Sequence, residues 1–173
     1  MREIVTHRLS GHRDAVRYIR DTVPEAVRLV RQAKSGPMPR TRWVLTTLDG
    51  LHEVGAESIG RAVGVPRSVW ENDTLHGEHG PSDRPYAYTV IAPHGVDILI
   101  AVREALDVLD GVLVHEPVHA LQIGRARRDE TAFMLHEYGV HPLSAWQLRR
   151  AHQRRRHDEA EAQRIEHRLL ARL

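Results

Sequence analysis

The chain has 173 residues, a formal net charge of +2 and no cysteine. Disulfide bonds and thiolate metal sites are therefore excluded, and any metal ligands must be His, Asp or Glu. This length predicts a single domain, residues 1–173, with a hydrophobic core of its own. Because Lys34 is the only lysine among 25 basic residues, we attribute the arginine content to a GC-rich gene and do not expect nucleic-acid binding.

Nothing in the sequence indicates export or a membrane span. Residues 1–7 lack the apolar core of a signal peptide. No stretch approaches the 18 or so apolar residues that a transmembrane helix requires. We therefore expect a cytoplasmic protein without a membrane segment.

The first part of the chain predicts a helix followed by a strand. Apolar residues recur at helical spacing over residues 11–34, where Pro24 is expected to break or restart the helix. A β-branched, apolar run at 41–48 predicts a strand, and Asp49-Gly50 predicts the turn that ends it.

A second helix and a polar segment come next. Residues 51–63 predict a short helix that stops at Gly64. Residues 66–85 are polar and rich in turn formers, as in a loop that borders a cleft. That segment also holds three side chains able to bind a metal, which we interpret as solvated: His76, Glu78 and His79.

Two short apolar runs predict an antiparallel hairpin. Residues 86–92 and 96–102 have the composition of strands, and Pro93-His94-Gly95 between them predicts a turn. The hairpin directly precedes the segment with the strongest chemical signal.

That segment is residues 114–122, Val-His-Glu-Pro-Val-His-Ala-Leu-Gln. His115 and His119 are four residues apart, which places both imidazoles on one face of a helix where they can bind one metal ion. Glu116 projects about 100° away from His115, beside the metal and not on it. From there its carboxylate can accept a proton from an attacking water.

Pro117 leaves two structures open for this helix. Either the helix is continuous and kinked between Leu113 and Pro117, or a new helix begins near Glu116 with the proline in its first turn. The apolar stripe keeps helical spacing through the proline, which favours continuity.

The remainder of the chain predicts two more helices. Gly124 marks the end of the motif helix, and a short helix at 130–138 is expected to be capped by Gly139. Residues 143–173 can form one long, arginine-rich helix.

The HExxH segment resembles the active-site helix of the zincin metallopeptidases, closely over residues 112–122 and loosely over 86–163. The resemblance implies Zn²⁺ as cofactor, His115 and His119 as ligands, and Glu116 as the catalytic base. It also implies an edge strand above the metal that binds extended peptide, which we assign to residues 96–102.

Gluzincins, the zincin subgroup that this chain resembles, take a glutamate from a following helix as third ligand. The stretch 158–163 is similar to their acidic segment, and helical phase places Glu159 nearer the inward face than Glu161. We therefore predict Glu159 as the third metal ligand. The alternatives are Glu161, Glu137 and His141.

The predicted fold is α+β: a minimal zincin-like domain with a small, mostly antiparallel sheet packed on the motif helix, and a long C-terminal helix. The predicted function is zinc-dependent hydrolysis of a peptide or protein substrate, with His141 or Tyr138 stabilising the oxyanion. The alternative is an inactive zincin-like or unrelated binding protein. Its arginine-rich helix, with five arginines and no acid from Arg149 to Arg156, would bind nucleic acid or an acidic partner.

Overall fold

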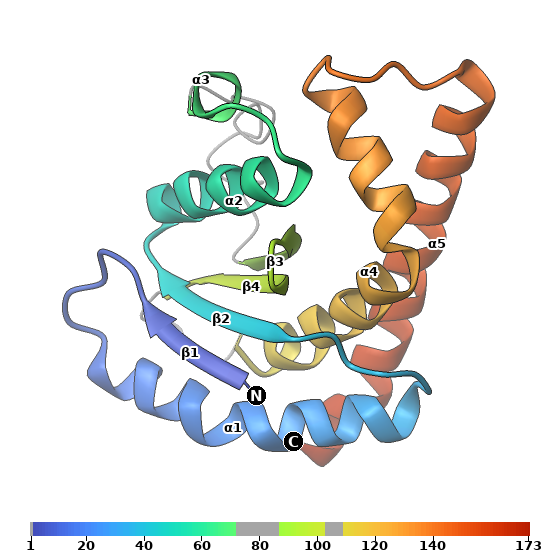
Figure 1. The fold of residues 1–173 in the computed structure, drawn as a ribbon. Helices are drawn as coiled ribbons and strands as arrows, with labels where there is room; N and C mark the ends of the chain where they lie inside the picture. The colour runs from blue at the N-terminus through green and yellow to red at the C-terminus, as the bar shows by residue number, and fades with distance from the viewer. Residues whose placement is uncertain (1, 72–86, 103–108) are drawn as a thin grey trace.

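The computed structural model describes residues 2–71, 87–102 and 109–173. At its centre lies a four-stranded sheet with the order β1-β2-β4-β3 (Figure 1). Its strands are β1 (Arg2–Thr6), β2 (Thr41–Thr46), β3 (Ala87–Ala92) and β4 (Gly95–Ala101). The α+β class is confirmed, and so is the hairpin formed by β3 and β4.

The expectation of a mostly antiparallel sheet is wrong, because β2 pairs in parallel with both β1 and β4. Only β3 and β4 are antiparallel. The N-terminal strand had not been predicted, and it creates a strand–helix–strand crossover through α1, which gives a parallel pair. As is usual for parallel strands, β2 and β4 are buried on both faces.

Helices cover both faces of the sheet (Figure 1). Buried side chains of α1, α4 and α5 form one cluster with Trp43, Leu45 and Ile98. Those of α2 form a second with Val44 and Leu99. The helices are α1 (Arg13–Ala33), α2 (Leu48–Val63), α3 (Arg67–Trp70), α4 (Leu109–Glu137), α5 (Ala145–Leu169) and the 3₁₀ turn η1 (Leu170–Arg172). None of the helices in the described ranges is long and apolar enough to cross a membrane.

Two predicted interruptions in the first half of the chain are wrong. Helix α1 continues through Pro24. The proline costs the helix one backbone hydrogen-bond donor. The helix continues because its inward face is buried: Ile19, Val23 and Val27 are at most 2% exposed. The Asp49-Gly50 turn is instead the first turn of α2, since the Thr47 hydroxyl caps that helix by accepting from the Gly50 amide.

Helix α4 consists of two helical segments joined at a kink at Ala126, where φ and ψ are −108° and 21°. The predicted end of the motif helix at Gly124 therefore lies two residues before the observed kink, and the second segment runs on to Glu137. At its C-terminus the Val140 amide donates to the Leu135 carbonyl and Gly139 has φ 68°, as predicted for a glycine cap.

Helix α5 begins with a capping box in which Ser144 and Gln147 bond each other's backbone amides. It runs antiparallel to α4 along its length and ends beside α1 (Figure 1). The predicted long C-terminal helix is thus confirmed over Ala145–Leu169. This packing is what brings α5 onto the histidine face of α4.

The continuous form of the motif helix is the one observed, with Pro117 inside it and fully helical geometry around it. Pro117→Ala is therefore expected to raise the free energy of unfolding by about 1–2 kcal/mol. A proline inside a helix costs about 3 kcal/mol relative to alanine, and the lost burial of its ring offsets part of the gain. Denaturant unfolding measures the change, with Pro142→Ala, outside any helix, as control. A destabilised Pro117→Ala protein would contradict this account.

Candidate metal centre

The two motif histidines converge on one point. His115 and His119 lie one turn apart on α4, and their Nε2 atoms are 2.9 Å from each other. Both rings are largely shielded, with side chains 16% and 22% exposed. Two imidazole nitrogens at this distance require either a proton or a cation between them.

The opposite ring nitrogens are held by polar side chains. His119 Nδ1 lies 2.8 Å from Gln122 Oε1. Because Gln122 Nε2 donates to the Asp158 carbonyl and to Glu161, the Oε1 atom must accept, and so His119 Nδ1 carries the hydrogen. The Nε2 lone pair of His119 is then directed towards His115. Such an outer contact is typical of metal-binding histidines.

His115 is oriented in the same way by α5. Its Nδ1 lies 2.8 Å from the Glu166 carboxylate, which can only accept. The position of the Glu166 carboxylate depends on Gly111, one turn earlier on α4. A Cβ atom at Gly111 would lie 2.8 Å from Glu166 Oε1. Glycine is a poor helix former, but at position 111 it makes room for this carboxylate.

Glu159 completes a triangle with the two histidines. Its Oε2 atom is 3.2 Å from His119 Nε2 and 3.6 Å from His115 Nε2. Zinc bonds of 2.0–2.1 Å in a tetrahedron place ligand atoms about 3.3 Å apart. The three observed separations lie on both sides of that value, so the two imidazoles and one carboxylate could hold a metal ion.

The other predicted third ligands lie elsewhere. Glu137 is exposed at the end of α4, 18 residues after His119 and beyond the bend at Ala126, and His141 is exposed beyond it. Glu161 bonds Gln122 and Lys34. Among the described residues, the one group of three or more candidate ligands is His115, His119 and Glu159.

Glu116 is 5% exposed and lines the same cleft as His115, His119 and Glu159, without being one of the three converging ligand atoms. Burial raises the pKa of Glu116, although the two histidines and a hydrogen bond from Thr89 oppose the shift. Thr89 Oγ1 donates to Glu116 Oε2 at 2.8 Å. A buried carboxylate with a raised pKa holds a proton more firmly than an exposed one, as a general base at neutral pH requires.

The site opens into a cleft of about 430 Å³ lined by α4, α5 and β3, including Ala87, Tyr88 and Thr89. The assignment of residues 96–102 as the substrate strand is wrong, because β4 is paired on both sides. Strand β3 is the edge strand beside the site among the described residues. Tyr138 and His141 do not line the cleft, which removes them as oxyanion groups. The cluster at 76–79 lies outside the described residues.

A chain of hydrogen bonds, called the relay below, connects His119 with Lys34 at the C-terminal end of α1, and it had not been predicted. Lys34, 7% exposed, donates to Glu161, and Glu161 accepts in turn from Gln122, which holds His119. Burial raises the pKa of Glu161, but Lys34 and Gln122 outweigh it, so that the net shift is downward. The relay uses the only lysine in the chain, a signal that was visible in the sequence.

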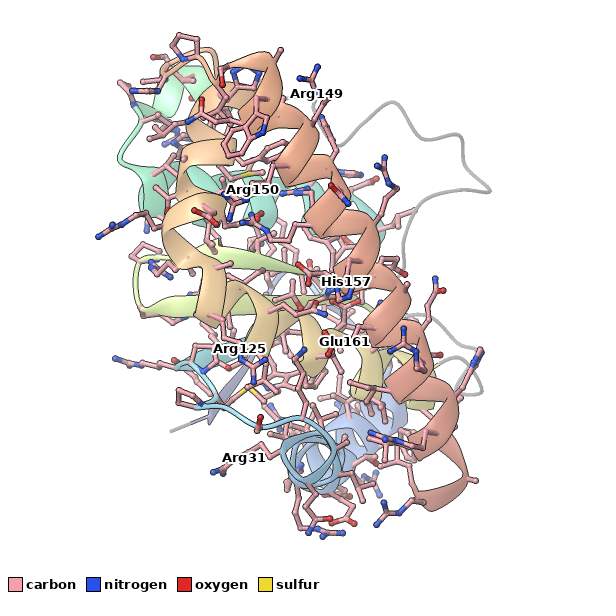
Figure 2. All side chains as sticks on the ribbon, turned by 90° about the vertical axis from the view of Figure 1, so that its right-hand side faces the viewer. Arg31, Arg125, Arg149, Arg150, His157 and Glu161 are labelled. Carbon is pink, nitrogen blue, oxygen red and sulfur yellow. The ribbon has the colours of Figure 1, made fainter. Side chains whose placement is uncertain are left out.

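Lys34→Met is expected to lower zinc affinity by less than the 10–100-fold or so that losing a direct outer partner of a metal ligand costs, because Lys34 acts on His119 through Glu161 and Gln122. Without the ammonium group, the Glu161 carboxylate loses its charge partner and no longer anchors Gln122. Competition with a chromophoric chelator measures the affinity. Arg31→Met, exposed on the same helix (Figure 2), is the matched control. Equal affinities of the two variants would exclude the relay.

Zinc affinity is expected to fall as the pH drops through the pKa of His119. Burial lowers the pKa of His119, but Glu159, Glu116 and Gln122 outweigh it and the net pKa lies above its ordinary value of 6.5. Binding requires an unprotonated Nε2, so below this pKa affinity falls about tenfold per pH unit for each proton displaced. Titrations between about pH 5 and pH 8 measure the slope. An affinity independent of pH would contradict the assignment.

Comparison of the chain with protein-family models, with curated proteins and with solved structures gives no match. The chemistry assigned to the site therefore rests on its own geometry.

Proposed function

We propose that this protein is a zinc-dependent hydrolase of the zincin type that cleaves peptide bonds. The observation that carries the proposal is the His115–His119–Glu159 triangle, with both Nδ1 atoms held by Gln122 and Glu166. That arrangement leaves two Nε2 lone pairs and one carboxylate oxygen facing a common point. Without a metal, the His119 imidazole hydrogen-bonds Glu159 and lowers the pKa of that carboxyl to about 2, so the carboxylate is ionised and available when a metal replaces the proton on His119.

Zinc bound at this point would polarise the scissile carbonyl and lower the pKa of water towards about 7. Glu116 is the residue that accepts the proton of the attacking water and delivers it to the leaving amine. Thr89 holds the Glu116 carboxylate in orientation through the 2.8 Å hydrogen bond. Gln122 and Glu166 keep the histidines in the tautomer that binds metal.

An extended peptide is the substrate class that the surroundings favour. Strand β3 forms one wall of the cleft and has no described neighbour on its outer side. An edge strand beside a site can pair with an extended chain through backbone hydrogen bonds. The peptide would then lie across the cleft with its backbone near Glu116.

Zinc-loaded protein incubated with a mixed peptide library and with an unfolded protein tests the proposal, with products identified by mass spectrometry. We expect cleavage that stops when the zinc is removed with a chelator and returns when zinc is restored. Binding of zinc without cleavage of any substrate would overturn the hydrolase assignment and favour a protein that only binds metal.

A further inference from the structure

The outer face of α5 is a strip of basic side chains. Figure 2 looks onto this side of the molecule and labels Arg149, Arg150 and His157. At helical spacing from these residues, further exposed arginines and histidines continue the strip towards the C-terminus. The strip consists of Arg149, Arg150, His152, Arg156, His157, Arg164, His167 and Arg168.

The four acidic residues of α5 bond other side chains or line the cleft. The structure, which describes α5 completely, turns three of the four towards the cleft and the histidine pair. The fourth, Glu161, is 26% exposed and lies at the edge of the strip, beside His157 (Figure 2). Glu159 and Glu166 bond the histidines, and Glu161 bonds Lys34 and Gln122. Asp158 lines the cleft. The strip itself therefore contains no acidic residue from Arg149 to Arg168, which is 20 residues or about 28 Å of helix.

Two other arginines of α5, unlike those of the strip, have acidic partners. Arg154 and Arg155 are paired with Asp129 and Glu130 of α4. The five arginines of the strip form no ion pair with any described residue, and Arg150 contacts the ring of Trp146 instead. At least five positive charges along α5 thus have no ion-pair partner in the part of the chain that the structure describes.

We propose that this strip binds the phosphate backbone of double-stranded DNA. Duplex DNA carries one negative charge per 1.7 Å or so of its axis, so a segment as long as the strip presents a continuous line of phosphates. Arginine is the side chain best suited to bidentate contact with phosphate. The B-form major groove also admits a helix, whereas the deep, narrow groove of duplex RNA does not.

Other polyanions fit the strip less well. A membrane-surface helix needs large apolar side chains beside its charges, and the exposed positions from Arg149 to Arg168 have none larger than alanine. Proteins for single-stranded nucleic acid use repeated aromatic platforms, and α5 has a single Trp, Tyr or Phe, Trp146. Duplex DNA requires neither feature.

The test is the fluorescence anisotropy of a labelled 20-bp duplex of random sequence, titrated with full-length protein at several salt concentrations. For five phosphate contacts, we expect log K to fall against log salt with a slope of about −4.5. Arg149→Gln/Arg156→Gln/Arg164→Gln should bind at least about tenfold more weakly and lose about 2.7 of that slope. The matched control is Arg13→Gln/Arg20→Gln/Arg40→Gln, which removes the same charge from exposed positions outside α5.

The control should bind nearly as well as wild type, and circular dichroism should show both triple variants folded. Equal losses in the two triple variants would overturn the proposal, because net charge alone would then explain binding. Absence of binding at about 50 mM salt would overturn it as well. Tighter binding to poly-glutamate, to single-stranded DNA, to duplex RNA or to vesicles of phosphatidylserine would reassign the strip to another partner. None of these results depends on zinc or on peptidase activity.

Discussion

Glu116→Gln is expected to keep its zinc and its fold while losing peptide cleavage by about 10²–10⁴-fold, the usual contribution of a general base. Glutamine has nearly the same size and can still accept from Thr89, which bonds Glu116 Oε2 in the wild type. It cannot accept a proton at neutral pH. Because Glu116 is not among the three candidate ligands, its replacement leaves those three ligand atoms in place.

The loss should lie in kcat, measured with a peptide that the wild type cleaves, at zinc content held equal. Glu130→Gln is the matched control, since Glu130 also lines the cleft but bonds Arg154 and Arg155. Full activity in the Glu116→Gln protein would show that proton transfer at this site uses another group, and the mechanism would be wrong.

Glu159→Ala is expected to lower zinc affinity by more than the 10–100-fold or so that loss of an outer partner costs. It removes one of three atoms that face the metal position. Its side chain is about half exposed, at 49%, so the fold should tolerate the change. Activity falls with zinc occupancy and should recover in part at high zinc concentration.

Glu137→Ala serves as the control for this variant, because it removes an exposed glutamate far along α4. Its zinc affinity should equal that of the wild type. If Glu137→Ala weakened zinc binding while Glu159→Ala did not, the third ligand would be misassigned, although the histidine pair would stand.

The parts of the fold that local patterns determine were predicted from the sequence. The β3–β4 hairpin, the continuity of α4 through Pro117 and the glycine cap at Gly139 all follow from periodicity and turn chemistry. Errors arose where tertiary packing outweighed a local signal. Pro24 did not break α1, because its buried face holds the helix together.

The sheet could not be predicted in the same way. Parallel pairing of β2 with β1 and β4 joins segments far apart in the chain, and no local pattern specifies which strands become neighbours. The choice of β4 as the edge strand failed for this reason. Strand β3 occupies the edge beside the site.

In the site, spacing located the histidine pair and helical phase located Glu159, because both depend on one helix at a time. The outer partners depend on how helices pack together. Glu166 reaches His115 across the gap that Gly111 leaves, and Lys34 reaches the site from α1. Neither contact has a signature in the spacing of residues.

Metal analysis of purified protein by inductively coupled plasma mass spectrometry is the most direct test of the metal centre. Wild-type protein, equilibrated with zinc and freed of excess, should retain about one zinc ion per chain. His119→Ala, which removes one corner of the His115–His119–Glu159 triangle, should retain almost none. Equal zinc content in the two proteins, or none in the wild type, would contradict the assignment.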